Sequence, residues 1–169
     1  MLELEREYLP GQRRDLDRFP QAMPTPTVPP RRFGVLVVDD EETIRHLLWI
    51  GLHYHGLGVY LAASGTEALE KYAQHSSAIQ VALLDIQMPG MSGPETLADL
   101  RILSPQVRCC FMSGYATHYT PEQLHEMGVS SFVRKQFRLA TVAQMLLELA
   151  AKSMKIGSPA ELVRLTAYA

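Results

Sequence analysis

The chain has 169 residues, enough for one domain with a buried core and short for two. With 47% hydrophobic residues, 20% charged residues and a formal net charge of −2, it lacks the basic balance usual in nucleic-acid binders. No stretch approaches the roughly 20 consecutive apolar residues of a membrane span, and the N-terminus lacks the basic-then-apolar order of a secretory signal. We therefore expect a cytoplasmic protein that binds neither membranes nor nucleic acid.

Residues 1–32 differ in composition from the rest of the chain. They hold a dense group of prolines, namely Pro20, Pro24, Pro26, Pro29 and Pro30. Because proline has no N–H to donate to a helix or a sheet, this density predicts an extended, polyproline-like segment. We expect residues 1–32 to form a flexible, Pro-rich N-terminal extension, with a docking peptide for a partner domain as the alternative.

Beyond this extension, short apolar runs alternate with segments of helical periodicity. Residues 35–38 are an unbroken run of β-branched and aliphatic side chains, as expected of a parallel strand buried on both faces. Apolar residues then recur at helical spacing, at Ile44, Leu47, Leu48 and Leu52. Residues 58–63 predict a second strand, after which Ser64 and Glu67 form a capping-box pattern that opens a second helix.

The second half of the chain continues this alternation. The third, fourth and fifth strands are predicted at residues 81–84, 107–112 and 131–133. Further helices are predicted to begin at Ser92, at Thr120 and at about Leu139. The only two cysteines, Cys109 and Cys110, are neighbours in a predicted strand and should point to opposite faces. A disulfide between them is therefore not expected, in keeping with a reducing compartment.

Five strands alternating with five helices predict an α/β fold, a doubly wound parallel sheet with helices on both faces. We assign this domain to residues 33–153. Residues 154–169 are expected to form a C-terminal tail, in which Ser158 and Glu161 can open one more short helix.

Acidic residues stand where the first and third predicted strands end. Asp39 and Asp40 follow the first strand, and Asp85 follows the third. Ligands of open α/β sheets bind at the carboxyl ends of the strands, where the strand order reverses. In the flavodoxin-like order 2-1-3-4-5, a known arrangement that the residues alone do not establish, these two strands are neighbours. Three carboxylates then meet within a few ångströms.

Such a cluster repels itself unless a cation neutralises it. Oxygen ligands of this kind suit Mg²⁺, which typically binds one or two carboxylates together with substrate phosphate oxygens. A carboxylate beside the ion can attack phosphorus and form an aspartyl phosphate. Ser113, at the end of the fourth strand, offers a hydroxyl, and Lys135, after the fifth, offers an ammonium for the phosphoryl oxygens.

Four segments, VLVVDDEETIR, LLDIQMPGMSG, FMSGY and FVRKQF, resemble the signature segments of bacterial two-component response-regulator receiver domains. The resemblance covers about residues 33–152. Taken singly, each site residue has a structural explanation: the acid pair as a helix cap, Ser113 as a turn residue and Lys135 as a surface lysine. Their occurrence together, in order and at the ends of four strands, favours the functional interpretation.

The resemblance implies a role for each matching residue. Asp85 would be the phosphoacceptor, and Ser113 and Lys135 would contact the phosphoryl oxygens. Asp40, Asp85 and the backbone carbonyl of Gln87 would bind Mg²⁺ directly, with Asp39 acting through water. Ser113 and Phe132 would form the conformational switch, although Phe132 also fits a core aromatic residue.

The chain departs from the family at Gln136, because receivers usually have proline after the lysine, often in a cis peptide. A cis bond before a non-proline residue costs about 2.5–4 kcal/mol, so a trans bond is expected here. Gln136 keeps open a degenerate, non-phosphorylated receiver that acts as an interaction module. A Mg²⁺-dependent phosphatase with an aspartyl nucleophile is the other alternative, but that class has a D-x-D pattern on its first strand.

The resemblance also implies the partners of a stand-alone receiver. A sensor histidine kinase or phosphotransfer protein would donate the phosphoryl group. The receiver would be no enzyme beyond catalysing its own phosphorylation and dephosphorylation. Output would pass to a protein partner through the last helix, the fifth strand and the helix before it, and a homodimer could form on phosphorylation.

Overall fold

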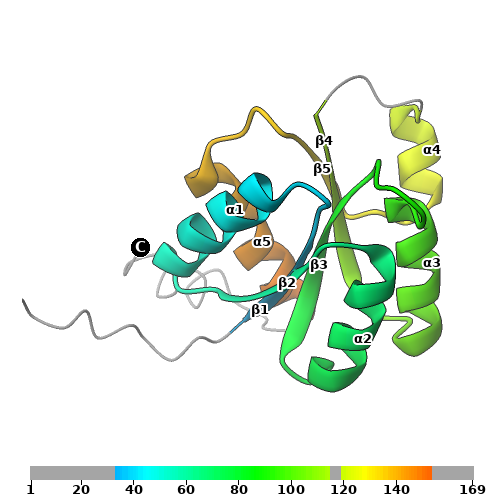
Figure 1. The fold of residues 1–169 in the computed structure, drawn as a ribbon, viewed down its shortest axis with the longest axis horizontal. Helices are drawn as coiled ribbons and strands as arrows, with labels where there is room; N and C mark the ends of the chain where they lie inside the picture. Colours follow the sequence, from blue (N-terminus) through cyan, green and yellow to red (C-terminus); the bar gives the residue numbers. More distant parts are fainter. Residues whose placement is uncertain (1–32, 115–118, 154–169) are drawn as a thin grey trace, which may run out of the picture.

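The computed structural model describes residues 33–114 and 119–153, which form a five-stranded parallel sheet with helices on both faces (Figure 1). The strand order is β2-β1-β3-β4-β5, which confirms the predicted fold class. The elements are β1 (Gly34–Val38), α1 (Glu42–Tyr54), β2 (Gly58–Ala62), α2 (Gly65–His75), β3 (Ile79–Asp85), α3 (Gly93–Leu103), β4 (Arg108–Ser113), α4 (Pro121–Glu126), β5 (Ser131–Arg134) and α5 (Leu139–Ser153). The predicted extension and tail lie outside the described residues.

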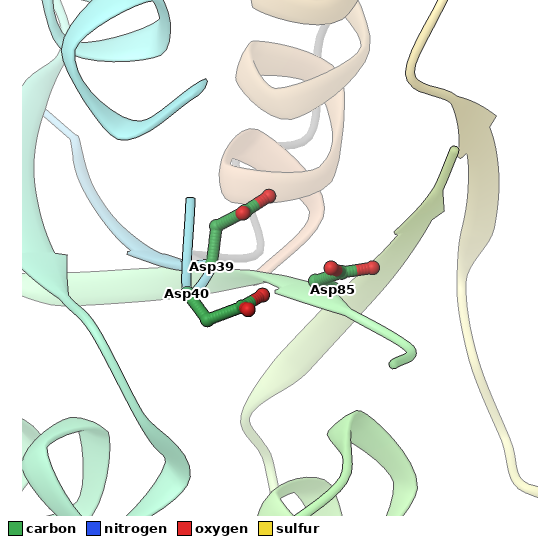
Figure 2. A group of neighbouring side chains, drawn as sticks. All are labelled: Asp39, Asp40 and Asp85. Carbon is green, nitrogen blue, oxygen red and sulfur yellow. The ribbon is translucent and has the colours of Figure 1, made fainter. Parts of the chain in front are cut away.

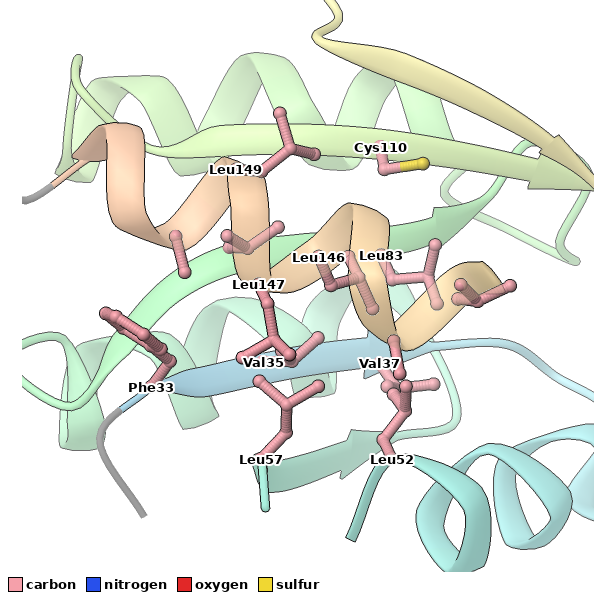
Figure 3. Packing of buried hydrophobic residues seen from close by; sticks show 14 of the residues in the cluster. Phe33, Val35, Val37, Leu52, Leu57, Leu83, Cys110, Leu146, Leu147 and Leu149 are labelled. Atoms are coloured by element: carbon pink, nitrogen blue, oxygen red, sulfur yellow. The ribbon is translucent and has the colours of Figure 1, made fainter. Parts of the chain in front are cut away.

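The sheet separates two hydrophobic cores. Alternate residues of β1 point to opposite faces, so Val35 and Val37 pack with α1 and α5, whereas Leu36 and Val38 pack with α2 and α3. Figure 3 shows the first core, in which Leu146 of α5 lies over β1 and β3. All five residues of β1 are buried, as the unbroken apolar run predicts. Within the described part, no helix is long and apolar enough to cross a membrane.

The two predicted helix starts on the second face differ in their hydrogen bonds. At α3 the capping box is complete, because the Ser92 hydroxyl accepts from the Glu95 N–H and the Glu95 carboxylate accepts from the Ser92 N–H at 2.8 Å. At α2 the Ser64 hydroxyl accepts from the Glu67 N–H at 3.2 Å. The Glu67 carboxylate, however, takes the N–H of Ala63 at 2.7 Å, so the predicted box forms only in part.

The cysteines give a prediction about thiol chemistry. Cys109 and Cys110 are both free and buried, on opposite faces of β4 as expected. Burial raises the pKa of the Cys110 thiol to about 12 and also raises the pKa of the Cys109 thiol. Because the thiolate is the reactive form, iodoacetamide at pH 8 should label neither cysteine in the native protein and both after unfolding in guanidinium. Native labelling at the unfolded rate, measured by intact mass, would contradict the burial.

Candidate functional site

Three carboxylates converge at the carboxyl ends of β1 and β3, which are neighbours in the sheet. Asp39 and Asp40 follow β1, and Asp85 is the last residue of β3. Each offers an oxygen within 4.8 Å of the others (Figure 2). Asp39 and Asp85 are buried and Asp40 is exposed, so the cluster opens to solvent on one side. The structure thus brings together the acids that the sequence places at two separate strand ends.

Lys135, just after β5, reaches into this cluster. Its Nζ lies 2.8 Å from Asp85 Oδ2 and 3.0 Å from Asp39 Oδ2, and the lysine side chain is 11% exposed. The same ammonium is 3.0 Å from Glu41 Oε1. The backbone N–H of Lys135 donates to the carbonyl of Ser113 at 2.8 Å, which extends the β4–β5 pairing to the site. The predicted site lysine is therefore the counterion of the acids.

Burial and charge act against each other in this cluster. Desolvation raises the pKa of Asp39 above its ordinary value, and the contact with Lys135 opposes that rise. For Lys135, desolvation alone would lower the pKa, but the interactions with Asp85, Glu41 and Asp39 outweigh it and raise the pKa. The lysine therefore stays charged at neutral pH.

One buried oxygen of Asp39 is incompletely satisfied. Its Oδ1 accepts the backbone N–H of Glu41 at 2.9 Å. Its Oδ2 has the ion-pair contact with Lys135 but no hydrogen bond of good geometry, because the ammonium donates to Asp85 and Glu41. A buried carboxylate oxygen without a hydrogen-bond donor is costly. An additional cation or a water molecule at this place would relieve that cost.

The loop that carries the acids is held by Arg45 from the first turns of α1. Its Nη1 donates to the carbonyls of Asp39 at 2.7 Å and Asp40 at 2.8 Å. Sequence reasoning missed both Arg45 and Glu41. The available signal was weak: an acid directly after the acid pair, and an arginine on the helix that follows it. These two residues fix the position of the acidic loop relative to α1.

The remaining predicted site residues lie on adjoining strands and loops. Ser113 ends β4 and is 2% exposed, and Asp85 is paired in register with its neighbour Met112. The backbone N–H of Gln87 donates to Asp85 Oδ1 at 3.4 Å, which places Gln87 in the loop beside that carboxylate.

Two expectations about the β5 region are settled. Phe132 is 37% exposed, so the alternative of a core aromatic is wrong, because β5 is the edge strand and its alternate side chains face outward. The peptide between Lys135 and Gln136 is trans, as expected without the proline.

Glycine is required where α3 meets the site. A Cβ on Gly93 would lie 2.2 Å from the carbonyl oxygen of Asp85, so a side chain could not fit there. Its N–H donates to the carbonyl of Ile86 at 3.1 Å. The first turn of α3 therefore packs directly on the backbone of Asp85 and fixes its direction.

The match to a known family is decisive. The sequence profile of the response regulator receiver domain matches residues 35–147. This chain belongs to that family. The receiver is 35% identical over 117 residues to the sensor kinase CckA of Brucella abortus, covering 68% of this chain and 12% of the kinase. It is 31% identical over 130 residues to the transcriptional regulatory protein YkoG of Bacillus subtilis, covering 73% of this chain and 55% of that protein.

Solved structures agree with this membership. The response regulator protein TrrA of Thermotoga maritima, in complex with Mg²⁺ and BeF, is 32% identical, with a TM-score of 0.60, and covers 69% of this receiver and 97% of that chain. The receiver spans only part of the length of CckA and YkoG. The shared unit is thus the receiver fold, and the predicted resemblance is confirmed.

Proposed function

We propose that this receiver accepts a phosphoryl group on Asp85, with Mg²⁺ bound beside that carboxylate. Receiver domains are signalling domains of two-component systems. The supporting observation is the setting of Asp85: it is 4% exposed, grouped with two other carboxylates and 2.8 Å from the Lys135 ammonium. Those are the surroundings that a carboxylate nucleophile and its phosphorylated product both need.

The residues present fit a hard cation. All three grouped side chains are carboxylates, and one buried oxygen of Asp39 lacks a hydrogen-bond donor. We assign direct binding to Asp40, Asp85 and the backbone carbonyl of Gln87, and binding through water to Asp39. When bound, Mg²⁺ supplies positive charge to the phosphoryl oxygens. TrrA, solved with Mg²⁺ and BeF, gives independent support.

The chain's own residues carry out the transfer. An oxygen of Asp85 attacks phosphorus, the bond from phosphorus to the donor breaks, and the leaving group keeps the electron pair. Lys135 donates hydrogen bonds to the phosphoryl oxygens, as it now does to the Asp85 carboxylate. The Ser113 hydroxyl donates a further hydrogen bond. Later attack of water on phosphorus returns the free carboxylate, so the only catalysis is of the receiver's own phosphorylation and dephosphorylation.

Receiver domains interact with histidine kinases and with downstream proteins. We propose a sensor histidine kinase or phosphotransfer protein as the donor. The output partner would bind α4, β5 and α5, where the exposed Phe132 lies. We assign the receiver to residues 33–153, preceded by the extension 1–32 and followed by the tail 154–169.

Labelling with acetyl phosphate tests the phosphoacceptor. Incubation with acetyl phosphate and Mg²⁺ should add one phosphoryl mass, and EDTA should prevent it. The Asp85→Asn variant should show no added mass, because the amide is not a nucleophile for phosphorus. Asp99→Asn, which changes a carboxylate of α3 outside the cluster, is the matched control and should label normally. Undiminished labelling of Asp85→Asn would refute the assignment, and no labelling of the parent protein would indicate a non-phosphorylated interaction module.

Switching makes a separate prediction. A charge-assisted hydrogen bond from Ser113 to the phosphoryl group is worth about 1.5–3 kcal/mol, enough to shift a two-state equilibrium roughly tenfold to a hundredfold. Beryllofluoride, which imitates the phosphoryl group, should therefore change hydrogen exchange in β5 and α4, and Ser113→Ala should largely remove the change. Changes confined to the loops that touch Asp85 would mean that the domain takes phosphate without switching.

A further inference from the structure

The outward side of α1 carries an apolar stripe of Leu47, Ile50 and Tyr54. Their exposed fractions are 43%, 61% and 79%, and each lies within the well-placed part of the helix. Spacings of three and four residues put the three side chains within about 60° of one another around the helix axis. Scattered exposed apolar residues are ordinary, but a row of them at helical spacing indicates a surface that something covers.

This stripe is distinct from the side of α1 that holds the helix on the sheet. Leu48, Gly51 and Leu52 form the buried side. Gly51 lies so close to α5 that a Cβ there would be 2.7 Å from the Leu139 side chain. A helix that packs on a sheet with one side normally presents polar residues on the other. The stripe is therefore a second apolar side that the core leaves without use.

The chain itself brings a suitable segment to the end of this stripe. The carbonyl of Phe33 accepts the N–H of Gly58 at 2.8 Å, and Gly58 follows Tyr54 by only four residues. Residues before Phe33 therefore leave the domain next to the last turn of α1. That part of the sequence contains Pro24, Pro26, Pro29 and Pro30, followed by two arginines.

We propose that residues 24–32 of the same chain pack along the Leu47, Ile50 and Tyr54 stripe as a polyproline segment. Such a segment has three residues per turn and rises about 3.1 Å per residue, so Pro26 and Pro29 lie on one side, about 9 Å apart. Leu47 and Tyr54 are separated by about 10.5 Å along the helix axis. The two spacings match, and the segment needs no sharp turn to reach the stripe from Phe33.

The chemistry of the two partners also matches. Proline-rich segments bind apolar surfaces that include aromatic rings, and they lose little conformational entropy because they are already extended. Tyr54, the most exposed of the three stripe residues, stands nearest to the point where the segment begins. Arg31 and Arg32 would then lie by the last turn of α1, whose carbonyls favour positive charge.

Paramagnetic broadening in the full-length chain tests this contact. A nitroxide is attached at Thr27→Cys, which the buried native thiols allow because they do not react. The methyl signals of Leu47 and Ile50 should relax several-fold faster than those of Ile102 and Leu103. The latter pair is the matched control, being equally exposed but on α3 at the other face of the sheet. Adding Pro26→Ser and Pro29→Ser to the labelled chain should bring all four to the same level.

A mixed sample separates this contact from one between two copies. Isotope-labelled protein without the nitroxide is combined with unlabelled protein that carries it. Docking within one chain leaves the methyl signals of the mixture unchanged. Broadening of Leu47 and Ile50 in the mixture would show that a second copy covers the stripe and would overturn the proposal. Equal relaxation of the two faces in the singly labelled chain, or broadening that survives the double proline change, would also overturn it.

Discussion

Lys135→Met is expected to lower the free energy of unfolding of the metal-free protein by about 3–5 kcal/mol, the usual cost of removing one partner of a buried ion pair. The lysine lies within 3.0 Å of two carboxylates whose side chains are 0% and 5% exposed, Asp39 and Asp85. Methionine preserves most of the volume but supplies no charge and no donor. The loss should therefore exceed what packing alone would cause, because two buried like charges remain without a counterion.

Urea unfolding in the presence of EDTA measures this loss. Lys71→Met is the matched control, since Lys71 also pairs with a carboxylate at 3.0 Å, that of Glu67. Both side chains of that pair are more than a third exposed, and surface pairs of this kind contribute about 0.3–0.5 kcal/mol. A Lys135→Met cost no larger than that of Lys71→Met would mean that the acids do not depend on the lysine.

The sequence was sufficient for the fold because its strongest signals are long-range and redundant. The buried runs of β1 and β3 leave no place for those strands except the centre of the sheet. Once the strand order is adopted, the polar residues at the strand ends must meet. The order itself came from the resemblance, and the structure confirms it.

What the sequence did not reveal depends on side-chain direction over one or two bonds. Glu41 shares the ammonium of Lys135, and Arg45 holds the acid loop, only because the first turn of α1 points both toward the cluster. Glu67 bonds to Ala63 in place of Ser64 for the same local reason. Phe132 was ambiguous because an edge strand with one open face has no sequence mark of its own. Local geometry of this kind follows from packing that no short motif encodes.

Mg²⁺ should stabilise the protein, and Asp40 should decide whether it does. A ligand that binds only the folded state adds about 2.7 kcal/mol at 100 times its dissociation constant. The parent protein should show a rise in Tm with millimolar Mg²⁺, and Asp40→Ala should abolish that rise. Glu42→Ala, which removes an exposed acid two residues further along, is the matched control and should keep it.

This variant separates metal binding from folding because Asp40 is not part of the lysine contacts. Lys135 pairs with Asp39, Glu41 and Asp85, and those contacts remain when the exposed Asp40 carboxylate is removed. The metal-free stability of Asp40→Ala should therefore equal or exceed that of the parent, since one of three like charges is gone. An unchanged Mg²⁺ response in Asp40→Ala would place the ion elsewhere. A fall in metal-free stability would mean that Asp40 supports the fold, and the two roles would then need a different residue to separate them.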